Sequence, residues 1–383
     1  MTIEQVVFDI DNTFGSFVCA QMKKLQVFET VAAEHLKQSP KKIREYLKEL
    51  NNAEGLDNSF VIQGIKAFRE FYFDPAHEKE MWELITSGRD VSKIYTKPYE
   101  GVTETLSTLK HNKIKMAVWS DAPWFKGVGR LIRMGLSDYF TVICAQKTSF
   151  DYHELYTPTL LKIYVDEEIA QVKKYGGMNG NNEGIIQVLN HHKPHLEGLD
   201  KIVAITGIPP EKMMMVGDNV TKDYSAQEKA GMCAILTKED LPTEEDYELL
   251  KRYIDMSINK SKSTRGQTDE GVKRKVNCMP ETLYYLLEEN KEFSVKSEDR
   301  MVLKPIISKL ENENYVIGLS KTINTELKLV EFNLKLVDKS TILNFEKEYI
   351  NLASLPIALD FATKEPNYFY KNGNEIIYCK KKL

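Results

Sequence analysis

The chain has 383 residues, of which 42% are hydrophobic and 28% are charged, and its formal net charge is −4 at pH 7. This length suffices for two or three domains, and the slightly acidic balance gives no electrostatic reason to expect nucleic-acid binding. Five scattered cysteines without a Cys-x-x-Cys pair indicate reduced thiols, and no run of 18 apolar residues is present that would cross a membrane. We therefore expect a cytoplasmic protein. No secretory leader is apparent, although export by a route that needs none stays open.

The first predicted strand ends in two carboxylates. Residues 6–8 form an apolar run that suits a buried parallel strand, and Asp9 and Asp11 follow directly. Aspartate is depleted in strands, so the strand is expected to stop there with its carboxyl end facing a ligand. The alternative is a turn in which these acids cap the next helix.

Residues 16–95 read as a set of helices. Residues 26–36 have a helical pattern, and residues 41–50 follow a Ser39-Pro40 start signal. The aromatic-rich residues 68–73 are expected to form the core of this helical unit rather than to contact a ligand.

Three later segments supply partners for the two acids. Residues 114–119 and 213–216 are further apolar runs, and a Lys-Pro pair between them opens a predicted helix. The polar residues at these points are, in chain order, Ser120, Asp121, Lys193, Asp218 and Asp223.

A long insertion precedes the Lys-Pro pair. Residues 158–175 read as a helix, and the Gly/Asn-rich residues 176–182 read as a surface turn because no Gly-x-x-x-x-Gly-Lys pattern is present. His191, His192 and His195 lack a cysteine or carboxylate at zinc-like spacing, so we expect them to lie in a solvated turn.

The order strand-Asp-x-Asp, strand-Ser, Lys-Pro and strand-Gly-Asp-x-x-x-x-Asp resembles the four motifs of the haloacid dehalogenase superfamily of phosphohydrolases. Flanking residues 98–102, 130–140 and 226–232 resemble family segments beside the second and fourth motifs. The resemblance covers most of residues 1–240. It implies an α/β fold, with a Rossmann-like parallel sheet core flanked by helices and a helical cap inserted after the first motif.

The resemblance implies separate roles for the acids. Asp9 would be the nucleophile that forms an aspartyl-phosphate, and Asp11 would protonate the leaving oxygen and then activate water. Mg²⁺ would be held by the side chains of Asp9 and Asp218 and by the backbone carbonyl of Asp11. Asp223 would hold a metal-bound water or orient Lys193. Its alternative role is a helix cap near Tyr224.

The remaining motif residues would bind the phosphoryl group. Ser120 and Lys193 would contact its oxygens, with the lysine offsetting the charge that develops in transfer, unless Lys193 is a solvated lysine at a helix start. Backbone N–H groups after Asp11, at Asn12 and Thr13, would add donors in an anion-binding turn.

Two residues depart from the family pattern. Ser16 stands where many relatives have Asp, and Asp121, which we place among the substrate-binding residues, stands where Asn or Gly is more usual. An extra acid beside a dianionic substrate weakens phosphate binding unless it points away or pairs with a base. The acid at Asp11 itself points to a phosphatase or phosphomutase, because dehalogenases of the family lack it.

The resemblance stops after residue 240. Residues 243–258 read as a helix, residues 259–275 as a polar linker and residues 281–289 as a short helix. From residue 314 the chain looks strand-rich, and an Asn-Gly pair predicts a hairpin over residues 368–378. No catalytic constellation is apparent there. Partner binding, oligomerisation and packing on the core all stay open.

We therefore predict a catalytic core of the haloacid dehalogenase type in residues 1–15 and 96–240, with an insertion at about residues 147–192. A helical cap would occupy residues 16–95 and a C-terminal α+β region residues 241–383. The predicted activity is that of a Mg²⁺-dependent phosphatase acting on a small phosphorylated metabolite, with no nucleic-acid or membrane partner. The alternatives are a phosphomutase, a phosphoprotein phosphatase and a non-catalytic binding protein on this scaffold.

Overall fold

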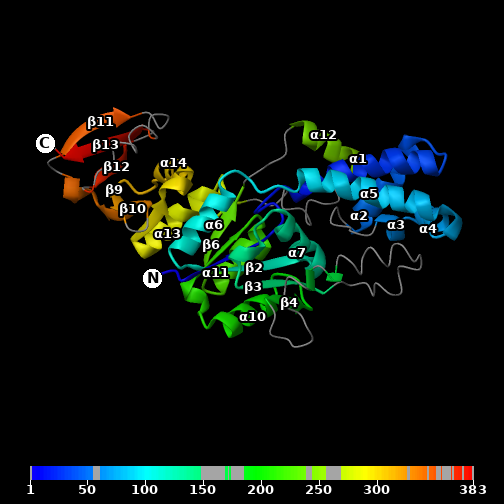
Figure 1. Ribbon diagram of the computed structural model, residues 1–383, viewed down its shortest axis with the longest axis horizontal. Coiled ribbons are helices and arrows are strands. Elements are labelled where there is room, and N and C mark those ends of the chain that lie inside the picture. The colour runs from blue at the N-terminus through cyan, green and yellow to red at the C-terminus, as the bar shows by residue number, and fades with distance from the viewer. Residues whose placement is uncertain are drawn as a thin grey trace.

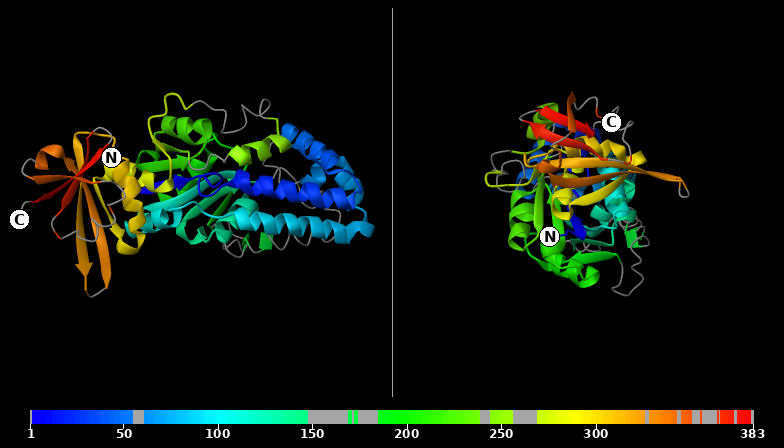
Figure 2. Two further views of the ribbon diagram at one scale, coloured as in Figure 1. Left: turned by 90° about the horizontal axis from the view of Figure 1, so that it is seen from above. Right: turned by 90° about the vertical axis from the view of Figure 1, so that its left-hand side faces the viewer.

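The computed structural model has three parts in a row: a helical cap, a parallel sheet flanked by helices, and an antiparallel sheet that contains the C-terminal strands (Figures 1 and 2). The structure describes residues 2–54, 61–147, 169–170, 172–173, 185–238, 244–255, 269–325, 328–342, 345–350, 355, 364, 366–372 and 375–381. Within these residues no helix is long and apolar enough to cross a membrane.

The central sheet has seven parallel strands in the order β4-β3-β2-β1-β5-β6-β7. Their bounds are β1 Gln5–Phe8, β2 Lys115–Pro123, β3 Val142–Gln146, β4 Ile186–Leu189, β5 Met213–Gly217, β6 Cys233–Thr237 and β7 Lys275–Val276. All residues of β1, β3 and β5 are buried, which explains their near-continuous apolar runs. The predicted α/β fold class is confirmed.

Side chains alternate between the two faces of the sheet. Val6 and Phe8 of β1 belong to the core on one face, and Val7 belongs to the core on the other. The flanking helices are α6 Val102–His111, α7 Trp124–Arg133, α10 Glu197–Thr206 and α11 Ala226–Lys229, with a π-helix at Val220–Ser225. Strand β4 lies within the predicted insertion and belongs to the core sheet.

The cap is a bundle of helices built around α1 Phe17–His35 and α5 Glu78–Tyr95. The helices between them are α2 Pro40–Glu54, α3 Val61–Gly64 and α4 Lys66–Tyr72. Phe68 and Tyr72 are fully buried in the cap core, so the prediction for this aromatic segment is confirmed. Ser16, one of the two departures from the family pattern, is the N-cap of α1, and its Oγ accepts a hydrogen bond from the backbone N–H of Cys19 (3.2 Å).

Residues after position 240 contribute to both the cap and the core. Helix α12 (Glu244–Tyr253) packs on the cap, where the Tyr253 hydroxyl donates a hydrogen bond to Glu29 (2.7 Å) and the Asn51 amide donates one to the Tyr253 carbonyl (2.9 Å). Strand β7 then pairs with β6 and extends the core sheet.

The C-terminal region is a six-stranded antiparallel sheet in the order β11-β13-β12-β9-β10-β8. Its strands are β8 Glu292–Lys296, β9 Tyr315–Asn324, β10 Leu329–Asp338, β11 Phe345–Ile350, β12 Asn367–Asn372 and β13 Glu375–Lys381, accompanied by α13 Thr282–Asn290 and α14 Leu303–Ser308. The predicted short helix and the terminal hairpin are confirmed as α13 and as β12 paired with β13.

This sheet packs on the unit formed by the parallel sheet and its helices, through a continuous apolar cluster and through side-chain bonds. The Asn112 side chain, for example, bonds to both the carbonyl and the N–H of Ser294 (2.7 and 2.9 Å). Most of the predicted helix over residues 158–175, the Gly/Asn-rich residues 176–182 and most of the predicted linker lie outside the described residues.

Candidate active site

The sheet brings the ends of three strands to one edge. Strand β1 lies between β2 and β5, and Phe8 is in register with Val118 on one side and Val216 on the other. Asp9, Ser120 and Asp218 therefore lie at the same edge, since parallel strands share their carboxyl ends. Strands β2, β3 and β4 follow one another outward on one side of β1, and the next strand along the chain, β5, lies on the other side of β1. Open α/β sheets bind ligands at such a switch in strand order.

Lys193 is the cation at the centre of this edge. Its side chain is almost fully buried, and its Nζ donates hydrogen bonds to Asp9 Oδ1 (2.8 Å) and Asp223 Oδ1 (2.5 Å). Burial favours the neutral amine, but Asp223, Asp9 and Asp121 outweigh burial and raise the pKa of Lys193 above its usual range. Lys193 is thus a buried, charged residue, and the solvated-lysine alternative is wrong. Helix α10 begins only at Glu197.

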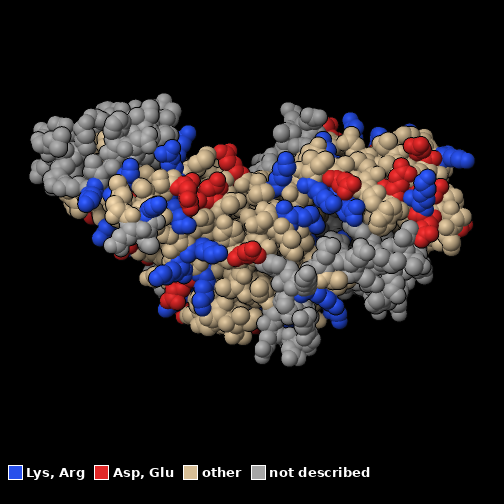
Figure 3. Space-filling view, viewed as in Figure 1, with Lys and Arg blue, Asp and Glu red and all other residues tan. Residues whose placement is uncertain are grey.

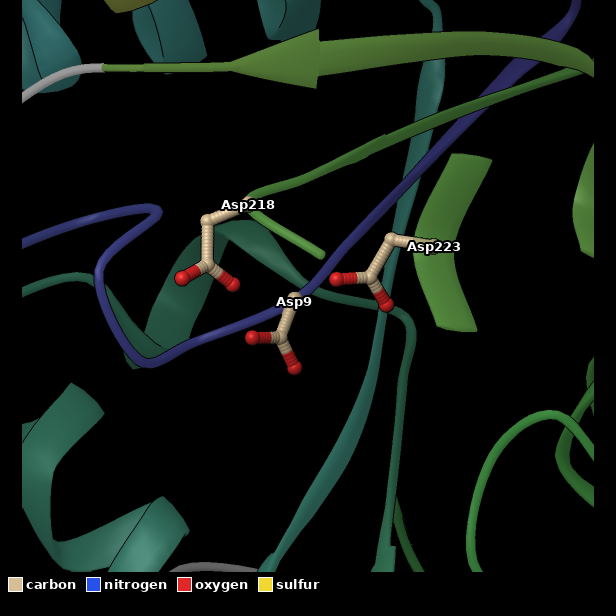
Figure 4. Close-up of side chains that lie close together, drawn as sticks. All are labelled: Asp9, Asp218 and Asp223. Atoms are coloured by element: carbon tan, nitrogen blue, oxygen red, sulfur yellow. The ribbon is translucent and has the colours of Figure 1, made fainter. Parts of the chain in front are cut away.

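Three carboxylates converge beside this lysine. Oxygens of Asp9, Asp218 and Asp223 lie within 4.8 Å of one another, and Figure 4 shows the three carboxylates side by side. Burial and the charges of Asp9 and Asp223 raise the pKa of Asp218 well above its usual range. Burial, opposed by Lys193, also raises the pKa of Asp223 to about 6. One lysine therefore compensates this cluster incompletely.

The donor set suits a hard divalent cation. Mg²⁺ is bound in proteins by one or two carboxylates together with water and phosphate oxygens. The cluster offers carboxylate oxygens at a strand edge, and its raised pKa values show that additional positive charge would be stabilised there. The residues present therefore fit Mg²⁺.

Gly217 is what allows Asp223 to reach the strand end. A Cβ at position 217 would lie 2.5 Å from the Cβ, Cγ and Oδ2 atoms of Asp223, which real atoms do not tolerate. The Asp223 carboxylate also accepts a hydrogen bond from the Asn219 N–H (3.0 Å). The helix cap here is Asn219, whose Oδ1 accepts from the N–H groups of Thr221 and Lys222, so the capping alternative for Asp223 is wrong.

Asp121, the second departure from the family pattern, is paired with bases. Its Oδ2 accepts a hydrogen bond from Lys222 Nζ (2.6 Å), and its Oδ1 accepts one from the backbone N–H of Lys193 (2.8 Å). Burial opposes ionisation, but Lys193 and Lys222 lower the pKa of Asp121 below its usual value. The acid therefore holds the loop of Lys193 in place, and its charge is offset within the protein.

The predicted phosphate-binding residues surround this edge. Ser120 is buried, and its Oγ accepts a hydrogen bond from the Ala122 N–H (3.2 Å). Asn12 has a left-handed backbone (φ +58°), and its side-chain amide donates to Asp218 (3.3 Å). Thr13 is fully buried, and its Oγ1 has no hydrogen-bond partner among the described residues.

Asp11 has a partner that the sequence analysis missed. The Arg130 guanidinium of α7 forms an ion pair with Asp11 (Nη2 to Oδ2, 2.9 Å) and lies over the Phe17 ring, 4.6 Å from its centroid. The sequence held a signal for this residue, because Lys126, Arg130 and Arg133 repeat at helical spacing on α7.

Asp11 and Arg130 also line a cavity of about 150 Å³ between the cap and the core. Its walls come mainly from α1, α5 and α7, and the sequence analysis did not predict it. His191, His192 and His195 lie outside this cavity and are exposed, and His191 is paired with Glu197 (3.0 Å). The prediction of a solvated histidine turn is confirmed.

Comparison with known proteins places the chain in a family. The family model of haloacid dehalogenase-like hydrolases matches residues 6–170, and a second model of the same hydrolase type matches residues 191–259. Comparison with curated proteins gave no match.

Several solved structures are similar to this chain at low sequence identity. A HAD phosphatase from Thermococcus onnurineus is 18% identical (65% of this chain, 97% of that chain, TM-score 0.37). A HAD family hydrolase from Deinococcus radiodurans R1, with bound phosphate and sodium, is 18% identical (75% and 96%, TM-score 0.39). A haloacid dehalogenase-like family hydrolase from Xanthomonas campestris is 15% identical (66% and 92%, TM-score 0.36). Because the two matched family models contain all four motifs, the chain belongs to the haloacid dehalogenase-like hydrolases.

Proposed function

We propose that the protein is a Mg²⁺-dependent phosphatase that hydrolyses a small phosphate monoester through an aspartyl-phosphate on Asp9. The observation that carries this proposal is the buried Lys193, bonded to both Asp9 and Asp223, with Asp218 in the same cluster. A phosphate monoester is dianionic, so a carboxylate nucleophile needs cations beside it. This edge of the sheet supplies one cation, Lys193, and its carboxylates suit a second, Mg²⁺.

The carboxylates of Asp9 and Asp218 and the backbone carbonyl of Asp11 would hold the metal. When bound, Mg²⁺ would neutralise charge between the phosphate and the nucleophile. Asp223 keeps the Lys193 ammonium directed at Asp9, which supports an orienting role for Asp223. Ser120 and the N–H groups of the Asn12–Thr13 turn would contact the remaining phosphoryl oxygens.

The reaction would have two steps. First, an Asp9 oxygen bonds to phosphorus while the bond to the leaving oxygen breaks, and Asp11 gives its proton to that oxygen. Next, Asp11 takes a proton from water as the water oxygen attacks phosphorus, which releases inorganic phosphate and regenerates Asp9. The position of Asp11 on the wall of the cavity beneath the cap supports its role on the leaving-group side.

We also propose the division of the chain that the motifs predicted: a catalytic core, a cap over residues 16–95 and a C-terminal region beginning after residue 240. The cap supports a small substrate, because a cavity of about 150 Å³ is below the roughly 300–1,000 Å³ of drug-sized sites. A phosphoprotein would have to insert its phosphorylated side chain into the same small cavity.

The test is release of inorganic phosphate from aryl phosphate, sugar phosphates and nucleotides, with Mg²⁺ or with EDTA. We expect turnover only with Mg²⁺, no turnover for Asp9→Asn, and a loss of about 10²–10⁴-fold for Asp11→Asn, which lacks the acid and base. Asp138→Asn, an exposed acid outside the site, is the control and should retain full activity. A near-wild-type rate for Asp9→Asn would sink the covalent scheme.

The same panel separates the alternatives. Isomerised sugar phosphate without free phosphate would favour a phosphomutase. No hydrolysis of any phosphoester, including the aryl phosphate, would favour a non-catalytic binding protein.

A further inference from the structure

The cavity beside Asp11 has an unusual charge balance. Of the 23 described residues that line it, seven are Lys or Arg and one, Asp11, is acidic. The whole chain, by contrast, has 52 basic and 56 acidic residues, so the positive bias belongs to this place and not to the composition. The seven are Lys24, Arg89, Lys93, Lys97, Lys126, Arg130 and Arg133.

These cations come from three helices that face one another. On α5 and the residues just after it, Arg89, Lys93 and Lys97 repeat every four positions, and α7 supplies a second basic stripe. Like charges at this spacing repel one another. Asp90 offsets part of the charge from outside the cavity, at 3.5 Å from Arg89 and 3.4 Å from Lys93.

The rest of the cavity wall suits a small organic molecule. Apolar side chains such as Phe17 and Ile85 alternate with polar ones such as Gln21 and Ser92. Figure 3 shows Lys and Arg side chains gathered on this face of the molecule near the junction of cap and core. The cap therefore presents cations and hydrogen-bonding groups to whatever lies beyond the phosphoryl group.

The position of the cations relative to Asp11 gives their role. Asp11 would protonate the leaving oxygen, so the leaving group lies on its side of the phosphorus. Arg130 connects this acid to the cavity, because it forms an ion pair with Asp11 and lines the same cavity as the other cations. A negative group on the leaving part of the substrate would thus lie among Arg130 and the cap residues Arg89 and Lys93.

We infer that the substrate is a small phosphate monoester whose leaving group carries a second anionic group, a phosphoryl or a carboxylate, which the basic cavity between cap and core binds. This inference rests on the proposed function and names its substrate class. The cations act by binding and orienting the leaving group beside Asp11, so that part of the binding energy positions the reacting bond.

The test compares substrates with and without the second anion on the full-length protein with Mg²⁺. Fructose 1,6-bisphosphate is matched with fructose 1-phosphate, 3-phosphoglycerate tests a carboxylate, and p-nitrophenyl phosphate has no second anion. The variant is Arg89→Gln with Lys93→Gln. Its charge-matched control is Lys66→Gln with Lys79→Gln, two exposed cap lysines outside the cavity.

We expect the wild type to have at least a tenfold higher kcat/KM for a substrate with the second anionic group than for a matched substrate without it. The cavity variant should reduce this ratio at least tenfold, and the control should keep it. Preference for the bisphosphate or for the phosphocarboxylate identifies the second group. If p-nitrophenyl phosphate is hydrolysed and no substrate with a second anionic group is preferred, the inference fails while the proposed function stands.

If no substrate releases phosphate, the proposed function fails and the cavity is tested by binding. Calorimetry with fructose 1,6-bisphosphate and 3-phosphoglycerate then measures Kd for the wild type and both double variants. A Kd at least tenfold weaker in the cavity variant alone supports the anion site. An equal Kd in all three proteins, or no binding to any of them, overturns it.

Discussion

Replacing Asp218 with asparagine should make the metal-free protein more stable, although it should destroy the proposed metal site. Asp218 lies within 4.8 Å of Asp9 and Asp223, and Lys193 is the nearby compensating cation. Two like charges at 4.8 Å repel by about 3 kcal/mol at an effective dielectric constant of about 20. Asp9 and Asp223 each repel Asp218, and attraction to Lys193 cancels about one of these two repulsions. Removing the repulsion that remains should stabilise the fold by on the order of 3 kcal/mol. Asparagine keeps the shape and an oxygen that accepts from Asn12.

The assay is the melting temperature in EDTA and during a Mg²⁺ titration. Wild type should melt lower than Asp218→Asn in EDTA at pH 7.5, and Mg²⁺ should raise the melting temperature of wild type alone, because a ligand stabilises the state that binds it. The raised pKa of Asp218 fixes the sign of the pH dependence. The carboxyl is protonated in both folded and unfolded states below about pH 4, so the difference should vanish there. It should grow as pH rises above about 4 and level off once pH exceeds the raised folded pKa.

The control is Asp138→Asn, which removes the same charge from an exposed position and should leave both the melting temperature and the Mg²⁺ response unchanged. The reasoning is refuted if Asp218→Asn melts below wild type in EDTA at pH 7.5. It is also refuted if the variant keeps the full Mg²⁺ shift.

Three further predictions concern the surroundings of the site. Lys193→Met should lower the free energy of unfolding by about 3–5 kcal/mol, because it leaves buried carboxylates without their cation. The measurement is urea unfolding at pH 7.5, and a loss below about 1 kcal/mol would contradict the prediction. Asp121→Asn should lower the melting temperature at pH 7. The difference from wild type should shrink as pH falls below about 4, because the Asp121 carboxylate, whose pKa is lowered, stabilises the fold only while it is ionised. A difference that does not depend on pH would count against the ion pair. Gly88→Val should destabilise the protein by about 1–3 kcal/mol, since a Cβ there would lie 2.2 Å from Phe28 Cε1 where α5 meets α1. Adding Phe28→Leu to the same chain should restore part of the lost melting temperature. If the melting temperature does not recover, the destabilisation has another cause.

The site could be predicted from sequence wherever a local pattern has one structural meaning. An apolar run that stops at a polar side chain marks the carboxyl part of a strand, and parallel strands bring these parts together. Asp9, Ser120 and Asp218 could therefore be placed at one edge, although β2 continues past Ser120 to Pro123. The pairing of β12 with β13 followed in the same way, because an Asn-Gly pair between two strand-like runs is typical of a hairpin.

Other features depend on which surfaces meet, and the sequence does not encode that locally. The basic stripes of α5 and α7 are visible as spacings, but only the docking of cap on core shows that they face one cavity. The pairing of Asp121 with Lys222 joins residues 101 positions apart. Strand β7 has only two residues, Lys275 and Val276, which is too short for any periodicity to show.

Helix α12 limits how far the cap can travel. The chain leaves the core sheet at the end of β6, Thr237, runs along the cap from Glu244 to Tyr253, and re-enters the core sheet at Lys275. An extended chain spans at most about 3.3–3.6 Å per residue, so the start of α12 can never lie more than about 25 Å from Thr237. While α12 stays docked, rocking of the cap therefore has an upper amplitude set by chain length. Insertion of residues before Glu244 would raise that limit without touching either the cap or the catalytic edge.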